Sequence, residues 1–201
     1  MADFEISNGT LVKYSGAGGE VTVPNEVSVI GAEAFRGCAA LTGITMPDSV
    51  KKIEFKAFQG CTGLKSVTIP ENVKVIEISA FNNCTALENV TIPGSVKVIG
   101  ISAFGGCTSL KSAELPDSVN EIDSCAFDDC TSLINVSIPG GIKVIESRAF
   151  GGCKSLDHIR FRGTSEQWKG ISKNFIFAQH CVLKCTDGDF GIDMNGNIKA
   201  D

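Results

Sequence analysis

Cysteine is the residue type that best equips this chain for chemistry, because its nine cysteines offer disulfide partners, metal ligands and nucleophiles. Six of them recur at an interval of 23 residues, at Cys38, Cys61, Cys84, Cys107, Cys130 and Cys153. In stacked repeats their Cα atoms would lie ~5 Å apart, but parallel Cα–Cβ bonds keep the Cβ atoms too far apart for an unstrained disulfide. We therefore predict buried free thiols that pack as small hydrophobic side chains.

The other three cysteines lie off this interval. Cys125 falls in a column whose other members are Glu33, Lys56, Ser79, Ser102 and Arg148. We therefore expect Cys125 to be exposed and open to oxidation or cross-linking. Cys181 and Cys185 lie close to His180, but alternation places both cysteines on one face with a single histidine nearby, whereas structural zinc takes four ligands at tighter, paired spacings. The sequence predicts no metal site.

Other signals for chemistry are weaker. The run Asp193-x-Asn195-x-Asn197 matches the start of a calcium loop but lacks the glycine at the sixth position and the closing glutamate, so a hairpin turn is the better interpretation. The two histidines, His158 and His180, accompany no nucleophile elbow, P-loop or paired-carboxylate motif. The sequence predicts neither an enzyme nor a cofactor.

The cysteines share their interval with two other residue types. All six prolines follow it, at Pro24, Pro47, Pro70, Pro93, Pro116 and Pro139. Six Ala-Phe pairs follow it too, ending at Phe35, Phe58, Phe81, Phe104, Phe127 and Phe150. A 23-residue period is typical of leucine-rich repeats, and we place six repeats in residues 21–162.

Each repeat predicts one strand and one turn. Residues 64–69 have the L-x-x-L-x-L form of a strand that lines a solenoid, with Val67 and Ile69 pointing into the core. Pro70 ends the strand, because it has no N–H to donate. A short helical or 3₁₀ turn is expected to carry Ala80–Phe81 on the convex side.

Both ends of a solenoid need caps, since they expose core and strand edges. Residues 1–20 predict a hairpin around Asn8-Gly9. Residues 163–201 predict a short helix, with Thr164 and Gln167 at capping-box spacing and Trp168 over the last core layer. A small antiparallel β-meander over 181–185, 189–194 and 197–200 follows.

Together these features predict one α/β domain over residues 1–201. The predicted fold is a leucine-rich-repeat right-handed superhelix with a parallel β-sheet on its concave side, between a hairpin cap and a helix-plus-meander cap.

Composition excludes several classes of partner. The net charge of −5 over 201 residues argues against nucleic acid or an anionic membrane as an electrostatic partner. No apolar run approaches the ~18 residues of a membrane span, so membrane insertion is not expected. The first ten residues lack the charged-then-apolar build of a secretory signal, which predicts either an intracellular protein or a mature or trimmed chain.

The repeat pattern resembles the BspA-like, Treponema-type leucine-rich repeats. The best matches are 90–100 (VTIPGSVKVIG) and 103–110 (AFGGCTSL), and 161–171 (FRGTSEQWKGI) resembles the segment that closes such arrays. This resemblance implies a surface or secreted adhesion module that binds protein or glycan, with no catalytic residues to carry over. A cytoplasmic location is the alternative if the gene truly lacks a signal peptide. The chain departs from the pattern where acidic residues replace a glycine, at Glu54, Glu77, Asp123 and Glu146.

The predicted concave face carries the candidate binding residues. They are Thr45, Ser66, Thr68, Asn89, Thr91, Ser112, Glu114, Asn135, Ser137, His158, Arg160 and Arg162, with Gly43 at the first position. One interpretation is a rigid polar ladder that recognises a partner, whose basic end of His158, Arg160 and Arg162 contacts an anionic group. The other is that serine and threonine simply suit exposed strand positions.

The convex side carries a second candidate surface, at Phe55, Ile78 and Ile101. These residues either tuck against the turns, half-buried, or form a self-association patch to which Cys125 adds a cross-link. We therefore expect a non-enzymatic protein- or glycan-binding module of the bacterial surface. A self-assembling structural scaffold and an intracellular protein–protein adaptor are the alternatives, and the sequence leaves oligomer formation open.

Overall fold

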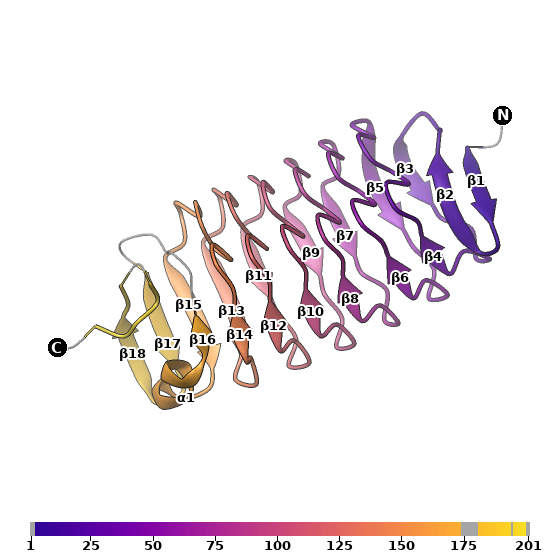
Figure 1. Ribbon diagram of the computed structural model, residues 1–201. Helices are drawn as coiled ribbons and strands as arrows, with labels where there is room; N and C mark the ends of the chain where they lie inside the picture. Colours follow the sequence, from indigo (N-terminus) through magenta and orange to yellow (C-terminus); the bar gives the residue numbers. More distant parts are fainter. Residues whose placement is uncertain (1–2, 174–180, 194, 200–201) are drawn as a thin grey trace.

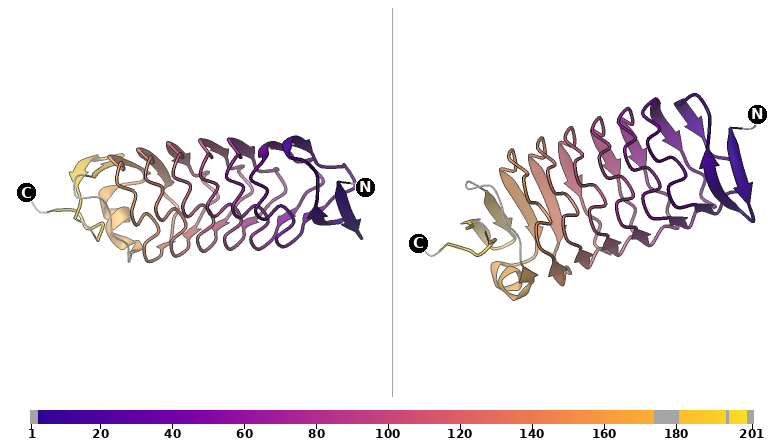
Figure 2. Two further views of the ribbon diagram at one scale, coloured as in Figure 1. Left: turned by 90° about the horizontal axis from the view of Figure 1, so that it is seen from above. Right: turned by 45° about the horizontal axis from the view of Figure 1, so that its top comes forward.

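The computed structural model describes residues 3–173, 181–193 and 195–199, and it is a β-solenoid. Each repeat makes one turn of the coil and contributes one strand to each of two faces (Figure 1). Seen from above, the turns follow one another in register from the N-terminal hairpin to the C-terminal cap (Figure 2). Parallel pairing between consecutive turns is the arrangement that the repeat predicts; the handedness of the coil and its curvature stay predictions.

One face, which we call the strand face, holds the predicted strands in two sheets. The four-stranded sheet consists of β3 (Gly19–Thr22), β5 (Leu41–Thr45), β7 (Ser66–Thr68) and β9 (Asn89–Thr91). The five-stranded sheet consists of β11 (Ser112–Glu114), β13 (Asn135–Pro139), β15 (His158–Arg162), β17 (Val182–Cys185) and β18 (Gly188–Gly191). Neighbouring strands are parallel except β17 and β18, which form an antiparallel hairpin.

A third sheet, on the other face, runs the length of the solenoid and was not revealed by the sequence. Its nine strands are β1 (Phe4–Ser7), β2 (Thr10–Tyr14), β4 (Val29–Ile30), β6 (Lys52–Ile53), β8 (Val75–Ile76), β10 (Val98–Ile99), β12 (Glu121–Ile122), β14 (Val144–Ile145) and β16 (Ser172–Lys173). Seven of these strands are only two residues long. Such short pairs give no alternating pattern of their own, and only the stacking of repeats turns them into a ladder.

The convex turns are not the short helical or 3₁₀ segments that the sequence predicts. Each turn is a series of β-turns: the N–H of Ala34 donates to Gly31 (3.2 Å) and that of Arg36 to Glu33 (3.0 Å). The N–H of Glu33 donates instead to the next repeat, at Phe55 (3.0 Å). The equivalent position is left-handed in every repeat, with φ between 52° and 59° at Glu33, Lys56, Ser79, Ser102, Cys125 and Arg148. A residue in that conformation stops a helix from propagating. The helix α1 (Ser165–Gly170) is the only one in the described residues.

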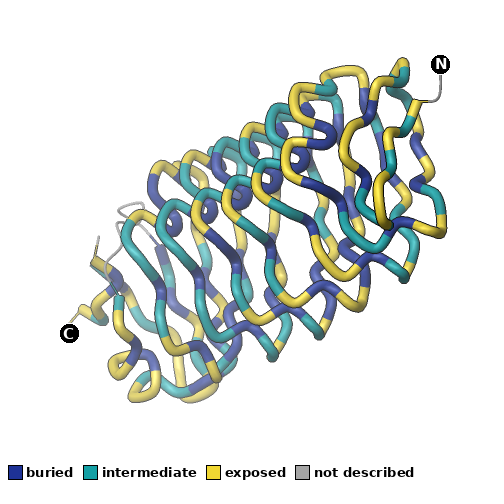
Figure 3. The backbone as a smooth tube through the Cα atoms, turned by 45° about the vertical axis from the view of Figure 1, so that its right-hand side comes forward, coloured by how far each residue is buried: buried dark blue, intermediate teal, exposed yellow. Residues whose placement is uncertain are grey.

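A ladder of aromatic rings forms the axis of the core. The six repeat phenylalanines are fully buried and stack with centroids 4.9–5.4 Å apart. Tyr14 continues the stack onto Phe35 at 5.0 Å, and Phe4 tilts against Tyr14 at 5.4 Å. Figure 3 shows buried positions recurring in register along the coil. The hairpin thus closes the core with its own aromatic residues.

The periodic cysteines are free thiols that do more than fill space. Five of the six are buried, and Cys38 in the first repeat is partly exposed. Each buried thiol donates to the carbonyl of the preceding repeat's phenylalanine, as in Cys107 Sγ to Phe81 O at 3.2 Å. The same carbonyl accepts the N–H of Cys84 at 3.2 Å. The thiols therefore tie consecutive repeats together.

Burial predicts which thiols react. It raises the pKa of Cys107 to about 12 and that of Cys185 to about 11, and the thiolate is the reactive form. In the folded protein at pH 8 we expect Cys125 to react first with Ellman's reagent, Cys38 and Cys185 more slowly, and the buried thiols only in denaturant. The Cys125→Ser variant should lose the fast phase. The structure would be contradicted if more cysteines than the three partly exposed ones reacted rapidly with the reagent in the native state.

The two ends of the solenoid carry a hairpin and a short helix, respectively. Asn8 and Gly9 have positive φ, at 50° and 73°, in the turn between β1 and β2. At the other end, Thr164 Oγ1 accepts the N–H of Gln167 (3.2 Å), and the Gln167 side chain accepts the N–H of Thr164 (2.8 Å), forming the predicted capping box. Trp168 is fully buried. In the described residues of this end, the predicted meander consists of the β17–β18 hairpin and one bridge between residues 192 and 198.

One acidic replacement in the glycine column makes stability depend on pH. Desolvation raises the pKa of Asp123 to about 6, and Glu121 and Glu146 add to the effect. The folded chain binds the proton of the Asp123 carboxyl group more tightly than the unfolded chain does. Protonation of Asp123 therefore stabilises the fold. This stabilisation is complete below pH ~4 and is lost as pH rises through about 6.

We expect Asp123→Asn to raise the free energy of unfolding above pH 7, by on the order of 1 kcal/mol after solvent screening. Urea denaturation at pH 7.5 and 4.5 should show a larger gain at the higher pH. Asp48→Asn, an exposed carboxylate elsewhere, serves as the control. An equal gain at both pH values would exclude the titration of Asp123 as the cause.

Candidate functional site

The strand face presents the predicted polar ladder. Its exposed members are Thr45, Ser66, Thr68, Asn89, Thr91, Ser112, Glu114, Asn135 and Arg160, and its partly exposed members are Ser137, His158 and Arg162. Gly43 corrects the expected pattern, because it is buried beneath the carboxylate of Glu20. Glu20 accepts a hydrogen bond from the Thr42 hydroxyl (3.3 Å). The ladder therefore begins at Thr45, and its two-residue alternation follows from the pleat of the strands.

The ladder is interrupted between β9 and β11, and we call this interruption the seam. Within the described residues, no backbone hydrogen bond joins 88–92 to 111–115. On either side the pattern continues: Ile69 N–H donates to Thr91 (3.0 Å) and Leu115 N–H to Ser137 (3.0 Å). On the opposite face, β10 and β12 pair normally. The two repeats are thus joined on one face and separated on the other.

The core beside the seam contains a smaller side chain than in the neighbouring repeats. Ala113 occupies the core position that Val90 and Val136 hold in the neighbouring repeats. The alanine side chain covers less of the core residues in the preceding repeat. Val90 in that repeat is partly exposed, whereas its counterpart Val67 is only 3% exposed. The seam therefore uncovers apolar core on an otherwise polar face.

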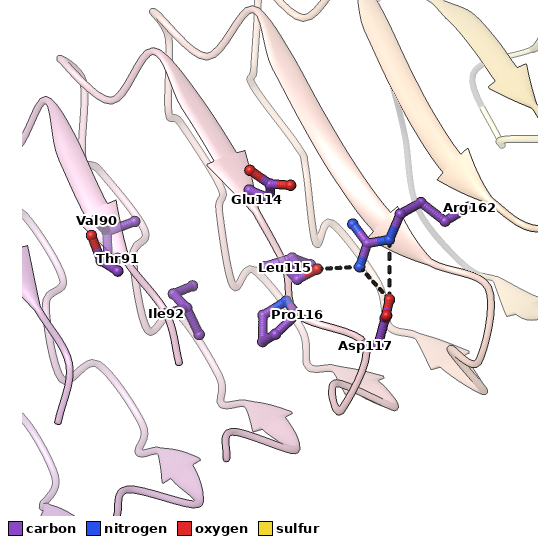
Figure 4. A pocket seen from close by; sticks show the side chains of 8 residues that line it. All are labelled: Val90, Thr91, Ile92, Glu114, Leu115, Pro116, Asp117 and Arg162. Carbon is purple, nitrogen blue, oxygen red and sulfur yellow. Dashed lines mark hydrogen bonds and ion pairs between the residues drawn. The ribbon is translucent and has the colours of Figure 1, made fainter. Parts of the chain in front are cut away.

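A pocket of about 550 Å³, the seam pocket, opens at this interruption (Figure 4). It is lined by Val90, Thr91, Ile92, Glu114, Leu115, Pro116, Asp117 and Arg162. Its apolar lining comes from Val90 and Ile92 on one side and from Leu115 and Pro116 on the other. Glu114, Asp117 and Arg162 supply charged groups to the same pocket.

Arg162 serves the fold rather than projecting freely from the basic end of the ladder. From β15 its guanidinium donates to Leu115 O (2.6 Å), to Ser137 Oγ (2.6 Å) and to Asp117, with which it forms an ion pair of 2.8 Å. These bonds tie the segment after β11 to β13 and β15. The sequence analysis grouped Arg162 with Arg160. Nothing in the sequence indicates that Arg162 binds Asp117 and Leu115, which lie 45 and 47 residues away.

A second hollow of about 450 Å³, the ladder pocket, adjoins the first. It is lined by Ser112, Ala113, Glu114, Asn135, Val136, Ser137, His158, Arg160 and Lys184. Six of these are predicted ladder residues, which the structure brings together across β11, β13 and β15. Sequence reasoning missed Lys184, which joins them because β17 pairs in parallel with β15.

Two cations stand side by side at the end of the ladder pocket. Arg160 and Lys184 are direct register partners on neighbouring strands, and both are exposed. Neither forms an ion pair within the described residues. His158 differs, since its Nδ1 lies 3.0 Å from Asp157 Oδ2. The free positive charge of this end therefore belongs to Arg160 and Lys184.

The three apolar convex candidates are exposed, rather than tucked against the turns. Phe55, Ile78 and Ile101 are 41%, 40% and 43% exposed, and the ammonium group of Lys56 lies 4.6 Å from the centre of the Phe55 ring. Cys125 is only partly exposed, in the left-handed turn column. These residues lie in the turns, apart from the strand face.

Possible metal ligands do not converge in the described part of the chain. Within it, no group of three or more His, Cys, Asp or Glu side chains is placed to hold an ion. Asp193 Oδ1 instead accepts the N–H groups of Asn195 and Asn197 (both 2.8 Å), as a hairpin-turn interpretation requires. His180 lies outside the described residues. No helix in the described residues is long and apolar enough to cross a membrane.

Comparisons with known proteins agree with this geometry. The family model of the BspA type leucine rich repeat region matches residues 13–130 and 76–186, in six copies. A leucine-rich repeat protein of T. pallidum is 36% identical, with a TM-score of 0.72 over 75% of this chain and 72% of that one. No curated protein matches the chain significantly.

Two longer solved structures are also similar. A leucine-rich repeat protein from Eubacterium ventriosum is 26% identical (TM-score 0.63), and 84% of this chain covers 45% of it. One from Bacteroides ovatus is 28% identical (TM-score 0.51), and 81% of this chain covers 52% of it. The chain thus spans about half the length of these two proteins.

Proposed function

Because the chain belongs to the BspA-type leucine-rich repeat family, we propose that it is a non-enzymatic binding module for a protein or a glycan, and that its strand face is the binding surface. The observation that carries this proposal is the placement of two adjoining pockets on a rigid, repeated polar surface. Backbone ladders hold the side chains of that surface in fixed positions, so little conformational entropy is lost on binding.

The proposed location is the bacterial cell surface or the surrounding medium, where an adhesion or host-interaction module would act. Family membership supports this location. An intracellular protein–protein adaptor would use the same strand face, and the residues preceding this chain in its gene would separate the two. A leader peptide there supports the surface, and an unbroken cytosolic domain supports the adaptor.

The test of binding is to screen the purified chain against a glycan array and a library of displayed peptides, and then to block the strand face. Asn135→Trp places a large ring over the ladder pocket, and we expect it to weaken binding of any true partner by tenfold or more. Lys97→Trp, an exposed position off this face, should bind as the wild type does. A partner that binds Asn135→Trp with undiminished affinity would show that the strand face is not the site.

Self-assembly is the second candidate function, favoured by the exposed convex residues Phe55, Ile78 and Ile101. If they form a contact between copies, the wild-type chain sediments as an oligomer and a Phe55→Ser, Ile78→Ser variant as a monomer. An unchanged mass in both proteins excludes this patch as an oligomer contact. Thr68→Ala with Asn89→Ala, on the strand face, is the matched control.

A further inference from the structure

We propose that the seam pocket and the ladder pocket form one continuous site for an extended polypeptide segment of a partner protein. The segment places an apolar side chain in the seam and an acidic side chain, about four residues away, against Arg160 and Lys184. This inference rests on the proposed function, since it names the class of partner that the strand face binds.

The two pockets adjoin at Glu114, which lines both of them. Together they extend over five neighbouring strands, β9, β11, β13, β15 and β17. With adjacent strands ~4.8 Å apart, the seam and the Arg160–Lys184 pair are separated by about three strand spacings, or ~14 Å. An extended chain covers that distance in about four residues at ~3.4 Å each.

The seam supplies the apolar end of this site. Val90 is partly exposed, and Ile92 is 8% exposed while its counterparts Ile69 and Leu115 are 1% and 0% exposed. A leucine, methionine or phenylalanine side chain inserted there would remove both surfaces from water, which is favourable in proportion to the area buried. The pocket volume of about 550 Å³ leaves room for such a side chain.

The cationic end supplies the second recognition element. Arg160 and Lys184 are directly opposite on parallel strands, and like charges in that arrangement destabilise a sheet. In the described residues neither forms an ion pair, although Asp189 lies opposite Lys184 on β18. A carboxylate between them would relieve the repulsion and form charge-assisted hydrogen bonds. An anionic group of the ligand would therefore balance the two positive charges at this end of the site.

A polypeptide fits the combined site better than an acidic glycan does. A sugar ring in the seam would bring hydroxyl groups against Val90, Ile92 and Leu115, where unpaired polar groups are costly to bury. A peptide instead offers an apolar side chain there, and backbone N–H and C=O groups for the hydroxyls and amides of Ser112, Asn135 and Ser137 in between.

The preference of the site for an acidic residue can be tested by reversing the charges of Arg160 and Lys184. A displayed library of random decapeptides should yield sequences with Leu, Met or Phe followed four positions later by Asp or Glu. Changing that acidic residue to its amide in a synthetic peptide should weaken binding about tenfold in fluorescence polarisation. An Arg160→Glu, Lys184→Glu variant should select Lys or Arg at the same position. A Lys97→Glu, Lys143→Glu variant has the same net charge but altered residues away from the ladder pocket, and should keep the acidic preference.

The seam can be tested by enlarging the core side chain beside it, at Ala113, which lines the ladder pocket and not the seam pocket. Ala113→Val restores the side chain of the neighbouring repeats and leaves every polar ladder residue in place. We expect it to fold normally and to bind the selected peptides about tenfold more weakly. It should bind a peptide with alanine in place of the apolar residue as the wild type does.

Each alternative outcome is informative. Selected peptides without this spacing, an unchanged preference in the charge-exchanged variant, or an unaltered affinity in Ala113→Val would overturn the inference. If acidic glycans bind at Arg160 and Lys184 and peptides do not, the polypeptide class is wrong while strand-face binding stands. If no peptide or glycan binds in a manner sensitive to Asn135→Trp, both the inference and the proposed function fail.

Discussion

Replacing Phe104 by alanine should lower the free energy of unfolding by about 3–5 kcal/mol, the range for deleting a large aromatic side chain from a packed core. The ring is fully buried and stacks between Phe81 and Phe127, at 5.4 Å and 5.3 Å. Its removal leaves a cavity bordered by the repeats on both sides. Because stability in a solenoid comes from interfaces between neighbours, one substitution weakens two interfaces.

The matched control is Phe4→Ala at the end of the same ladder. Phe4 is only partly buried, and its ring contact is with Tyr14, so we expect a loss below about 2 kcal/mol. Urea denaturation followed by circular dichroism measures both. Equal losses for the two variants would mean that the aromatic stack does not carry the stability of the central repeats.

Replacing Trp168 by alanine should have an effect of similar size, about 3–5 kcal/mol, but confined at first to the C-terminal cap. Its indole lies edge-on to Phe161 at 5.2 Å, and its Nε1–H donates to Gly196 O at 2.8 Å. Lys173 Nζ lies 5.4 Å from the same ring. Without the ring the last core layer meets water and the segment around Gly196 loses its attachment.

Trp168→Phe separates packing from hydrogen bonding. It keeps much of the apolar surface but leaves Gly196 O unpaired, at a cost of about 1–3 kcal/mol. Limited proteolysis should cleave Trp168→Ala after β15 before the repeats are cut. Cleavage that begins in the repeats instead would show that the cap does not protect the C-terminal end.

The strand face and the convex turns differ in how they hold their side chains. Within the described residues, titratable groups do not assemble into a metal-binding cluster, and the polar groups of the site lie on fixed strands. The convex turns, in contrast, carry strained left-handed residues such as Lys56 and Ser79. A glycine at those positions would relieve that strain.

Sequence alone determined the features that depend on local chemistry. The 23-residue spacing of proline, Ala-Phe and cysteine identified the repeat and its buried columns, because side-chain period and burial are linked directly. Asn8-Gly9 located the first hairpin and Thr164 with Gln167 located the helix start, since both depend on backbone groups within four residues. The orientation of the polar ladder followed from alternation in the same way.

Tertiary structure alone decided how the site is assembled. The nine-stranded sheet extends along the solenoid because two-residue segments such as Val75–Ile76 stack on their equivalents. Arg162 was expected at the basic end, but its partners Leu115 and Asp117 are two repeats away and take up most of its donors. Lys184 reaches Arg160 because β17 joins β15 in register. The periodic sequence makes all repeat interfaces look alike. The seam between β9 and β11 coincides with one small core residue, Ala113, and with the hydrogen bonds that Arg162 makes across repeats.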